Sequence, residues 1–212
     1  MRRSNAPSWR IACDFPEDLQ FAAYIGQQEQ FSLASDAPPR DAAERAWRVW
    51  WEALPHWLEE RDMQAQQMER ATPPVSAQEQ MRQIGALYTA RYDPPDFASL
   101  AATPALRDLC RQHWPVFQML WSPPGGEKMV LATMLGDQLR NVALNRMVRD
   151  CARVAGKRES APFLLRIDFT RWPADYLRVL SNTHIMLGAG YLAAARMADF
   201  AGLLREYVAL LV

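Results

Sequence analysis

The sequence predicts a mainly α-helical globular domain with a small C-terminal antiparallel β-meander, at about residues 163–187, and a final amphipathic helix. Three observations support this prediction. Apolar residues recur three or four positions apart over most of the chain, which is the spacing of one helix face. Near residue 163 the spacing changes to strict alternation, which is typical of strands. Four pairs of adjacent prolines divide the chain into separate elements.

Composition and charge describe an ordinary globular chain. Half of the 212 residues are hydrophobic and 23% are charged, so we expect one domain over residues 1–212 with a sizeable core. Lysine plus arginine equals aspartate plus glutamate at 24 each, so no overall field favours nucleic acid or an anionic membrane. The best candidate for a membrane span, residues 185–195, is shorter than the roughly 18 residues that a bilayer requires. We therefore expect no transmembrane helix.

The cysteines indicate a reducing compartment. Cys13, Cys110 and Cys151 are odd in number and widely spaced, which fits the cytosol better than a disulfide scaffold. The basic N-terminus is followed by acidic residues rather than by the apolar core of a secretion signal. The chain is therefore predicted to be cytoplasmic.

The first expected helix spans residues 14–33 and opens near Pro16. Its apolar positions are spaced for one helix face, so they are candidates for the core. These positions are Leu19, Phe21, Tyr24, Ile25 and Phe31.

The second expected helix, residues 40–70, carries the clearest signal in the chain. Trp47, Trp50, Trp51 and Trp57 share one face, so this face is predicted to be hidden. Because the stripe keeps its phase across Pro55, we expect a kink there and not a break. The four indoles are a wall of the core, the lining of an apolar pocket or a surface for a partner. Core packing is the favoured interpretation, since aromatic stripes at helical spacing usually build cores.

Two further helices are predicted before residue 122. Ser76 and Glu79 form a capping-box pattern ahead of an apolar stripe, which predicts that a helix starts there. Thr103 as N-cap and Pro104 at the first helical position begin another helix, whose apolar stripe runs over residues 106–117. Pro115 interrupts that stripe, which indicates two short helices at an angle.

The longest helical pattern runs from residue 127 to about 155 and is closed by Gly156 as a C-cap. In its second half the apolar side moves to another face. The original face then carries Arg146, Arg149 and Arg153. These arginines would face solvent, acidic neighbours or an anion.

The C-terminal part is predicted to contain three strands and one helix. Residues 163–170 alternate in hydrophobicity, and shorter strands are expected at 176–180 and 184–187. The last helix, about residues 190–211, ends in an apolar run. That run either docks in the core or completes an oligomer interface.

Two groups of residues are candidates for catalysis. Cys110 and His113 lie three positions apart on an apolar stripe, where a thiolate and an imidazole can bind metal or act as nucleophile and base. His184 could pair with Asp168 or Asp175 as base and orienting acid if the strands meet. In both groups a structural role is the favoured alternative, because buried His and Cys usually belong to the core.

Metal and anion sites are the remaining candidates. Glu52, His56 and Glu60 recur four positions apart, but they lie opposite the tryptophan stripe, where charged residues are normally solvated. We therefore expect no metal and no other cofactor. The loop at residues 122–128 lacks the spacing of a phosphate-binding loop, so a plain helix start is favoured. Arg146, Arg149 and Arg153 could hold an anion or an RNA phosphate, although a solvated face is favoured.

These observations favour a non-catalytic protein-interaction or scaffold domain that binds a protein partner or self-associates as a homo-oligomer. Nucleic acid and membrane partners are disfavoured. The alternative is a small-molecule binder or enzyme with an aromatic pocket between two helices, the one that carries Trp47 and Leu58 and the one that carries Leu106 and Phe117. These residues identify no family from which an activity can be inferred, so whether the chain is an enzyme stays open.

Overall fold

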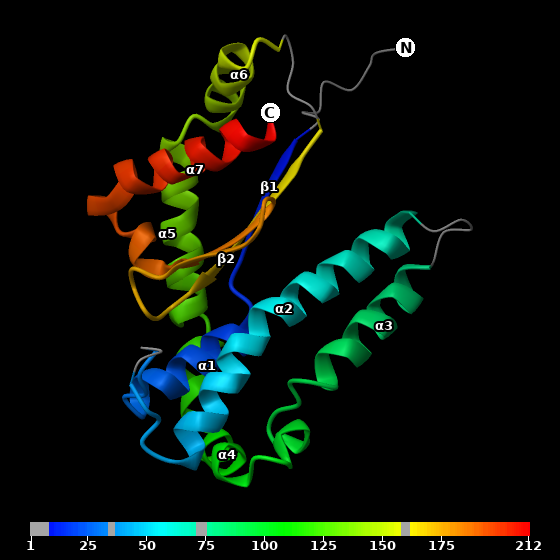
Figure 1. Cartoon of the computed structure of the whole chain (residues 1–212), viewed down its shortest axis with the longest axis vertical. Coiled ribbons are helices and arrows are strands. Elements are labelled where there is room, and N and C mark those ends of the chain that lie inside the picture. Colours follow the sequence, from blue (N-terminus) through cyan, green and yellow to red (C-terminus); the bar gives the residue numbers. More distant parts are fainter. Residues whose placement is uncertain (1–8, 34–36, 71–75, 158–161) are drawn as a thin grey trace. The chain divides into compact units, whose positions relative to one another are not determined.

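The computed structural model describes residues 9–33, 37–70, 76–157 and 162–212. Over these residues the chain forms seven α-helices, three short 3-10 helices and one four-stranded sheet (Figure 1). The predicted class, mainly α with a small sheet and a final helix, is confirmed. Within the described ranges, no helix combines the length and the hydropathy that crossing a membrane requires.

Residue contacts divide the chain into two compact units. Unit 1 consists of residues 1–16 and 124–212, and unit 2 consists of residues 17–123. Unit 2 is therefore inserted in the sequence of unit 1, between its first strand and its first helix. The expectation of a single domain over the whole chain stays a prediction.

Unit 2 is helical. Its first helix contacts the second and the fourth, and the second also contacts the third and the fourth. Figure 1 shows the second and third helices side by side and antiparallel. The elements are α1 Glu17–Gln28, α2 Ala42–Arg70, α3 Ala77–Thr89, the 3-10 helix η1 Ala98–Leu100 and α4 Pro104–Trp121.

Aromatic rings fill the core of unit 2. Phe21 of α1 is fully buried, and its ring lies 5.0 to 6.4 Å, centroid to centroid, from five other rings. Those rings belong to Trp50, Tyr92, Phe97, Trp114 and Phe117. The five positions predicted as core in the first helix are all buried. The helix itself starts at Glu17 and not at residue 14, because residues 10–14 form a strand.

Both internal prolines of unit 2 lie inside continuous helices. Helix α2 runs through Pro55, and α4 runs through Pro115. The prediction that Pro115 separates two short helices is therefore wrong. Pro115 is exposed, and the buried side of α4 continues beyond it with Phe117 and Trp121, so burial on that side favours a continuous helix. Ser76 caps α3 as predicted, accepting a hydrogen bond from Glu79 N. Thr103 occupies the N-cap position of α4 without a side-chain cap.

A buried carboxylate ties the segment before α2 to that helix. Glu44 is 1% exposed and accepts hydrogen bonds from the backbone N–H groups of Ser32 and Arg40. It also forms ion pairs with the side chains of Arg40, at 3.0 Å, and Arg48, at 2.7 Å. Burial by itself raises the pKa of a carboxyl, but these hydrogen bonds outweigh it and lower the pKa of Glu44 to about 2.

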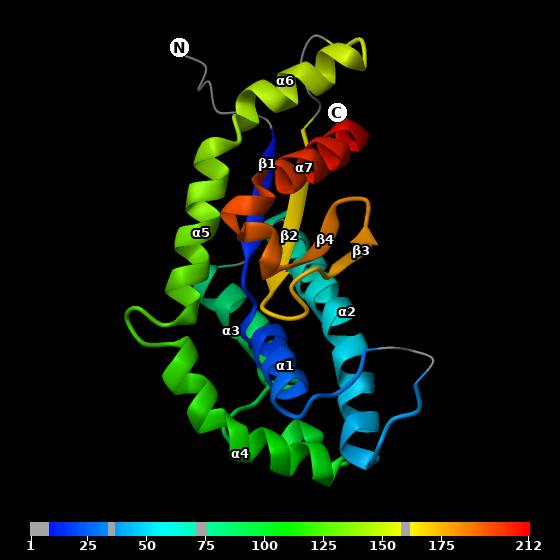
Figure 2. The same cartoon turned by 90° about the vertical axis from the view of Figure 1, so that its left-hand side faces the viewer.

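Unit 1 combines a sheet with three helices. Figures 1 and 2 show α5 (Glu127–Asn141) and α7 (Met197–Leu211) on the same side of the sheet. The elements are β1 Arg10–Asp14, α5 Glu127–Asn141, α6 Leu144–Val154, β2 Leu164–Thr170, β3 Leu177–Ser181, β4 His184–Gly188, η2 Ala189–Leu192, η3 Ala194–Arg196 and α7 Met197–Leu211.

The sheet is mixed, with strand order β1-β2-β4-β3. The predicted antiparallel meander is right only for β3 and β4, because β2 pairs in parallel with both β1 and β4. The connection after β2 carries the chain past β4 to the outer edge. It packs against the end of β4, where Gly190 N donates to Ala174 O. A Cβ at Gly188 would lie 2.2 Å from the same oxygen, so this approach needs a glycine.

The helix predicted over residues 127–155 is divided into α5 and α6. The chain becomes extended at Val142, which is buried. The predicted change of apolar face is therefore a change of helix, and the expectation of one continuous helix is wrong. Gly156 follows α6 with a positive φ of 73°, and Lys157 N donates back to Ala152 O, which completes the predicted cap.

The end of the chain is docked in unit 1. Helix α7 begins at Met197, later than predicted, because two 3-10 turns precede it. Phe200, Leu204 and Val208 are fully buried, and the Phe200 ring lies 6.1 Å from that of Phe169 on β2. Of the apolar run at residues 208–212, Val208 and Val212 are buried in the core, whereas Leu210 is 70% exposed. Docking in the core, one of the two predicted roles of this run, therefore holds for one of its faces.

Candidate functional site

The tryptophan stripe of α2 lies mostly inside unit 2. Trp47, Trp50 and Trp51 are at most 3% exposed, and Trp47 Nε1 donates to Ala22 O at 2.8 Å. Only Trp57 is partly exposed. The Trp50 ring lies 6.4 Å from that of Phe21, and the Trp47 ring lies 5.4 Å from that of Phe31, centroid to centroid. The interior of the stripe therefore packs against its own unit.

Cys110 and His113 have separate surroundings on α4. Cys110 is fully buried, and burial raises the pKa of its thiol far above the ordinary value. His113 is partly exposed, and its Nε2 lies 2.7 Å from Glu29 Oε1. The Tyr24 ring meets the imidazole edge to face, with centroids 5.9 Å apart. The structure therefore gives His113 an acidic partner just after the end of α1 and leaves Cys110 protonated.

His184 and Asp168 meet as the sequence suggested. His184 Nε2 on β4 lies 2.8 Å from Asp168 Oδ2 on β2. Arg166 Nε donates to both oxygens of the same carboxylate at 3.2 Å. Asp168 is 0% exposed and His184 4%, so this pair is buried, whereas the Arg166 side chain is 19% exposed. Asp175 instead pairs with Arg196.

The other polar candidates are dispersed. Glu52 and His56 are exposed on α2, whereas Glu60 binds Arg91 at 2.6 Å. Burial and the nearby carboxylates of Asp168 and Asp14 raise the pKa of Cys13 to about 12. In the part of the chain that the structure describes, no group of three or more His, Cys, Asp or Glu side chains is arranged to hold a metal ion.

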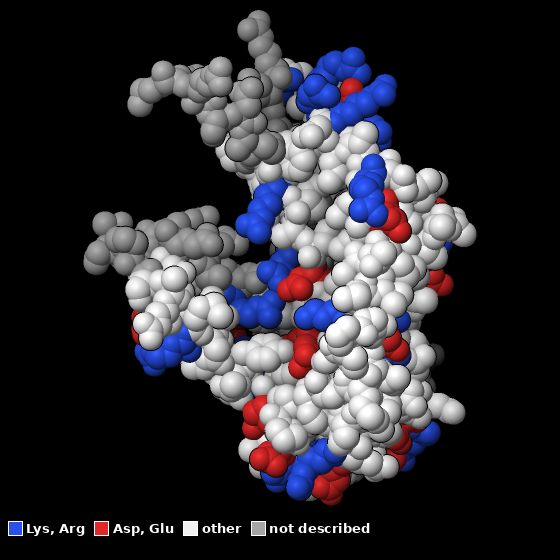
Figure 3. Space-filling view, turned by 180° about the vertical axis from the view of Figure 1, so that it is seen from behind, with Lys and Arg blue, Asp and Glu red and all other residues white. Residues whose placement is uncertain are grey.

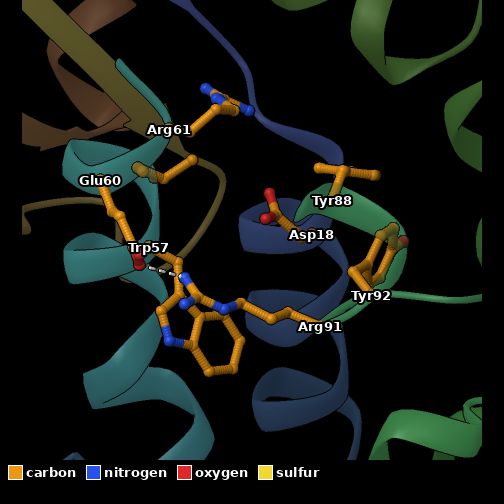
Figure 4. A pocket seen from close by; sticks show the side chains of 8 residues that line it. Asp18, Trp57, Glu60, Arg61, Tyr88, Arg91 and Tyr92 are labelled. Atoms are coloured by element: carbon orange, nitrogen blue, oxygen red, sulfur yellow. Dashed lines mark hydrogen bonds and ion pairs between the residues drawn. The ribbon is translucent and has the colours of Figure 1, made fainter. Parts of the chain in front are cut away.

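A small cavity of about 20 Å³ lies in unit 2 between α1, α2 and the end of α3. Figure 4 shows Trp57 and Glu60 on one side of it and Tyr88 and Tyr92 on the other. The Arg91 guanidinium crosses the cavity to reach Glu60 and lies 5.3 Å from the Trp57 ring centroid. This volume holds about one water molecule. These side chains therefore form a polar contact between helices and do not line a ligand pocket.

A larger groove lies in unit 1 between α6 and α7. Its volume is about 440 Å³, which is in the range of ligand and peptide sites. The groove is open to solvent. It is lined by Asn141, Val142, Ala143, Arg146, Met147 and Asp150 from the α5–α6 side and by Met197, Ala198, Ala201 and Arg205 from α7.

The groove has a mixed lining, in which six apolar residues lie beside one amide, two cations and one anion. Arg146 Nε lies 3.9 Å from Asp150 Oδ2, a loose pair in which the arginine side chain is 80% exposed. Across the groove, the Arg205 guanidinium forms no hydrogen bond or ion pair within the described residues. The groove therefore has an excess of one positive charge, and Arg205 is available to a ligand.

Basic side chains also cover the outer face of α6. Figure 3 shows Lys and Arg side chains gathered at the end of the molecule where Figure 1 places α6. Arg149 and Arg153 are exposed, and Arg153 pairs with Asp150 at 3.3 Å. Of the three arginines predicted as an anion site, only Arg146 lines the groove.

Sequence reasoning did not find the α7 side of the groove. Ala198, Ala201 and Arg205 recur at intervals of three and four, which places them on one helix face. That signal was available, but small residues with one arginine also describe an ordinary solvated face. What distinguishes them is the packing of α6 against α7, which joins segments about 50 residues apart.

The comparisons with known proteins add no relative. No protein-family model matches the chain, and neither the curated proteins nor the solved structures contain a match.

Proposed function

We propose that this chain is a non-catalytic protein-interaction protein that holds a segment of a partner protein in the groove between α6 and α7. The observation that carries the proposal is an open groove of about 440 Å³, lined by six apolar and four polar residues. One of the polar residues is Arg205, whose guanidinium has no partner within the described ranges. Methionines line it at positions 147 and 197, and flexible methionine side chains are common on surfaces that bind peptides.

The surroundings of the candidate catalytic residues support a non-catalytic role. A nucleophilic cysteine needs a lowered thiol pKa, whereas burial raises the pKa values of Cys13 and Cys110. A general base must reach its substrate, whereas His184 is buried with Asp168. These groups stabilise the fold in this proposal.

The proposal places the protein in the cytoplasm. Cys13, Cys110 and Cys151 are all free thiols, which fits a reducing compartment. The bound segment comes from another protein or from a second copy of this chain, and native mass spectrometry at several concentrations separates these two sources.

The test is a selection of partner segments. A phage library of random 18-residue peptides is selected against the immobilised protein, and the recovered peptides are measured for binding to Ala201→Trp. The new indole fills the groove, so binding is expected to fall at least about tenfold. Leu210→Trp, at a position that is 70% exposed on the opposite face of α7 and outside the groove, is the matched control and keeps full binding.

Two results would contradict the proposed function. One is a selection that yields no specific peptide. The other is a set of peptides whose binding is equally strong in Ala201→Trp, since these peptides would bind elsewhere. Circular dichroism melts of both variants exclude loss of fold as the cause.

A further inference from the structure

We infer that the segment bound in the groove between α6 and α7 is an amphipathic helix with an acidic residue at its centre. The inference rests on the proposed function and specifies the chemistry of the partner.

The dimensions of the groove fit a helix. The lining residues extend over positions 142–150 on one side and 197–205 on the other, about two helical turns each. Ala143, Ala198 and Ala201 contribute little volume, so a third helix can approach closely. Met147 and Met197 can adapt to its apolar side chains. A helix lying against α6 and α7 would complete a three-helix arrangement.

The charge of the groove selects an acidic residue. Arg205 has no partner among the described residues, and Arg146 is held only loosely by Asp150 at 3.9 Å. A glutamate brought between the two arginines would form charge-assisted hydrogen bonds as water is displaced. A lysine at the same place would meet two like charges.

The openness of the groove favours a polypeptide over a small amphiphile. Small-molecule sites usually enclose most of the ligand, whereas this groove is open to solvent and would leave much of a fatty carboxylate in water. An amphipathic helix places only one face in such a groove and keeps its polar face hydrated.

The experiment compares three fluorescent 18-residue peptides with one apolar stripe and a central Glu, Gln or Lys. Fluorescence anisotropy measures their binding to the wild-type chain, to Arg205→Glu and to the control Arg149→Glu. The Glu peptide is expected to bind the wild type at least about tenfold more tightly than the Lys peptide. Arg205→Glu reverses this preference, whereas Arg149→Glu, with the same charge change outside the groove, preserves it. Arg205 is exposed, so the variant should keep its fold, and Arg205→Gln serves as a milder second variant that abolishes the preference.

Several results overturn the inference. A preference for Glu that is equal in wild type and Arg205→Glu would place the peptide elsewhere. Equal binding of all three peptides, blocked by Ala201→Trp, would reject the acidic partner but retain the proposed function. Displacement of library peptides by dodecanoate, without binding of the Glu peptide, would assign the groove to an amphiphile. Failure of both the designed and the library peptides would remove the proposed function as well.

Discussion

The two units have interiors of different chemistry. Unit 2 is built from aromatic rings, and six of the eight tryptophans of the chain belong to it, at positions 47, 50, 51, 57, 114 and 121. The sheet of unit 1 is mainly aliphatic, but it buries the polar network of Asp168, His184 and Arg166. Aromatic packing is insensitive to pH, whereas a buried ionic network requires each of its partners. The two units are therefore expected to respond differently to truncation and to loss of charge.

The largest effect is expected from Phe21→Ala in unit 2. Phe21 contacts five rings and is 0% exposed, so its removal should lower the free energy of unfolding by about 4 kcal/mol. Urea unfolding followed by tryptophan fluorescence measures the loss. Hydrogen exchange with mass spectrometry should show faster exchange in α1 than in β2, because β2 belongs to the other unit.

Phe169→Ala is the matched truncation in unit 1. Phe169 is also 0% exposed and stacks on Phe15 with centroids 5.4 Å apart. It should accelerate exchange in β2 more than in α1. If both variants accelerated hydrogen exchange equally in α1 and β2, the two units would unfold as one body. That result would contradict the expectation that they respond separately.

The second effect concerns the polar network of unit 1. Asp168→Ala removes the carboxylate that the buried His184 shares with Arg166, while Arg166 keeps its ion pair with Asp14 at 3.6 Å. We expect the free energy of unfolding to fall by about 3 kcal/mol, because removing one partner of a buried pair leaves the other buried without a partner. Thermal unfolding measures it. A loss below about 1 kcal/mol would mean that water reaches the site and replaces the carboxylate.

A third prediction tests whether unit 2 also contains a carboxylate that its fold requires. Glu44→Gln removes the charge that accepts hydrogen bonds from Ser32, Arg40 and Arg48, so we expect a loss of about 2 kcal/mol at pH 7. Because folding lowers the pKa of Glu44 from 4.5 to about 2, its contribution is complete above pH 4.5 and disappears as the pH falls toward 2. Urea titrations at several pH values should show the two proteins converging in acid. A difference that stays constant from pH 7 to pH 2 would show that charge is not the cause.

The smallest effect is expected from an exposed ion pair. Arg153 is 80% exposed in its pair with Asp150, so Arg153→Gln should change the free energy of unfolding by less than about 0.5 kcal/mol. The change should shrink further in high salt. A loss comparable to that of Asp168→Ala would remove the distinction between buried and exposed charges.

The sequence identified what local periodicity determines. The helical class, the buried positions of α1, the Trp47 to Leu58 stripe, the Ser76 cap and strand β2 all followed from spacing of 3.6 or 2 residues. Each of these features depends on neighbours along the chain, so the necessary information lies in a short window.

Features that depend on distant partners were missed. Strand β1 has five residues, and its partner β2 begins at Leu164, so nothing near it in the sequence marks it as part of a sheet. The parallel pairing of β2 with β4 depends on where the connection after β2 packs. The groove likewise exists only because α6 and α7 pack together. That Arg205 has no partner among the residues with described positions is also a property of its spatial neighbours.

The insertion of unit 2 between β1 and α5 also affects the order of synthesis. Strand β1 leaves the ribosome early, but its partner β2 follows roughly 150 residues later, which at 5–20 residues per second is a delay of roughly 8 to 30 seconds. All of unit 2 is synthesised during that delay, and its contacts are local enough for it to fold first. Strand β1 would meanwhile expose unpaired backbone groups. The nascent chain is thus expected to carry a folded helical unit before its sheet can assemble.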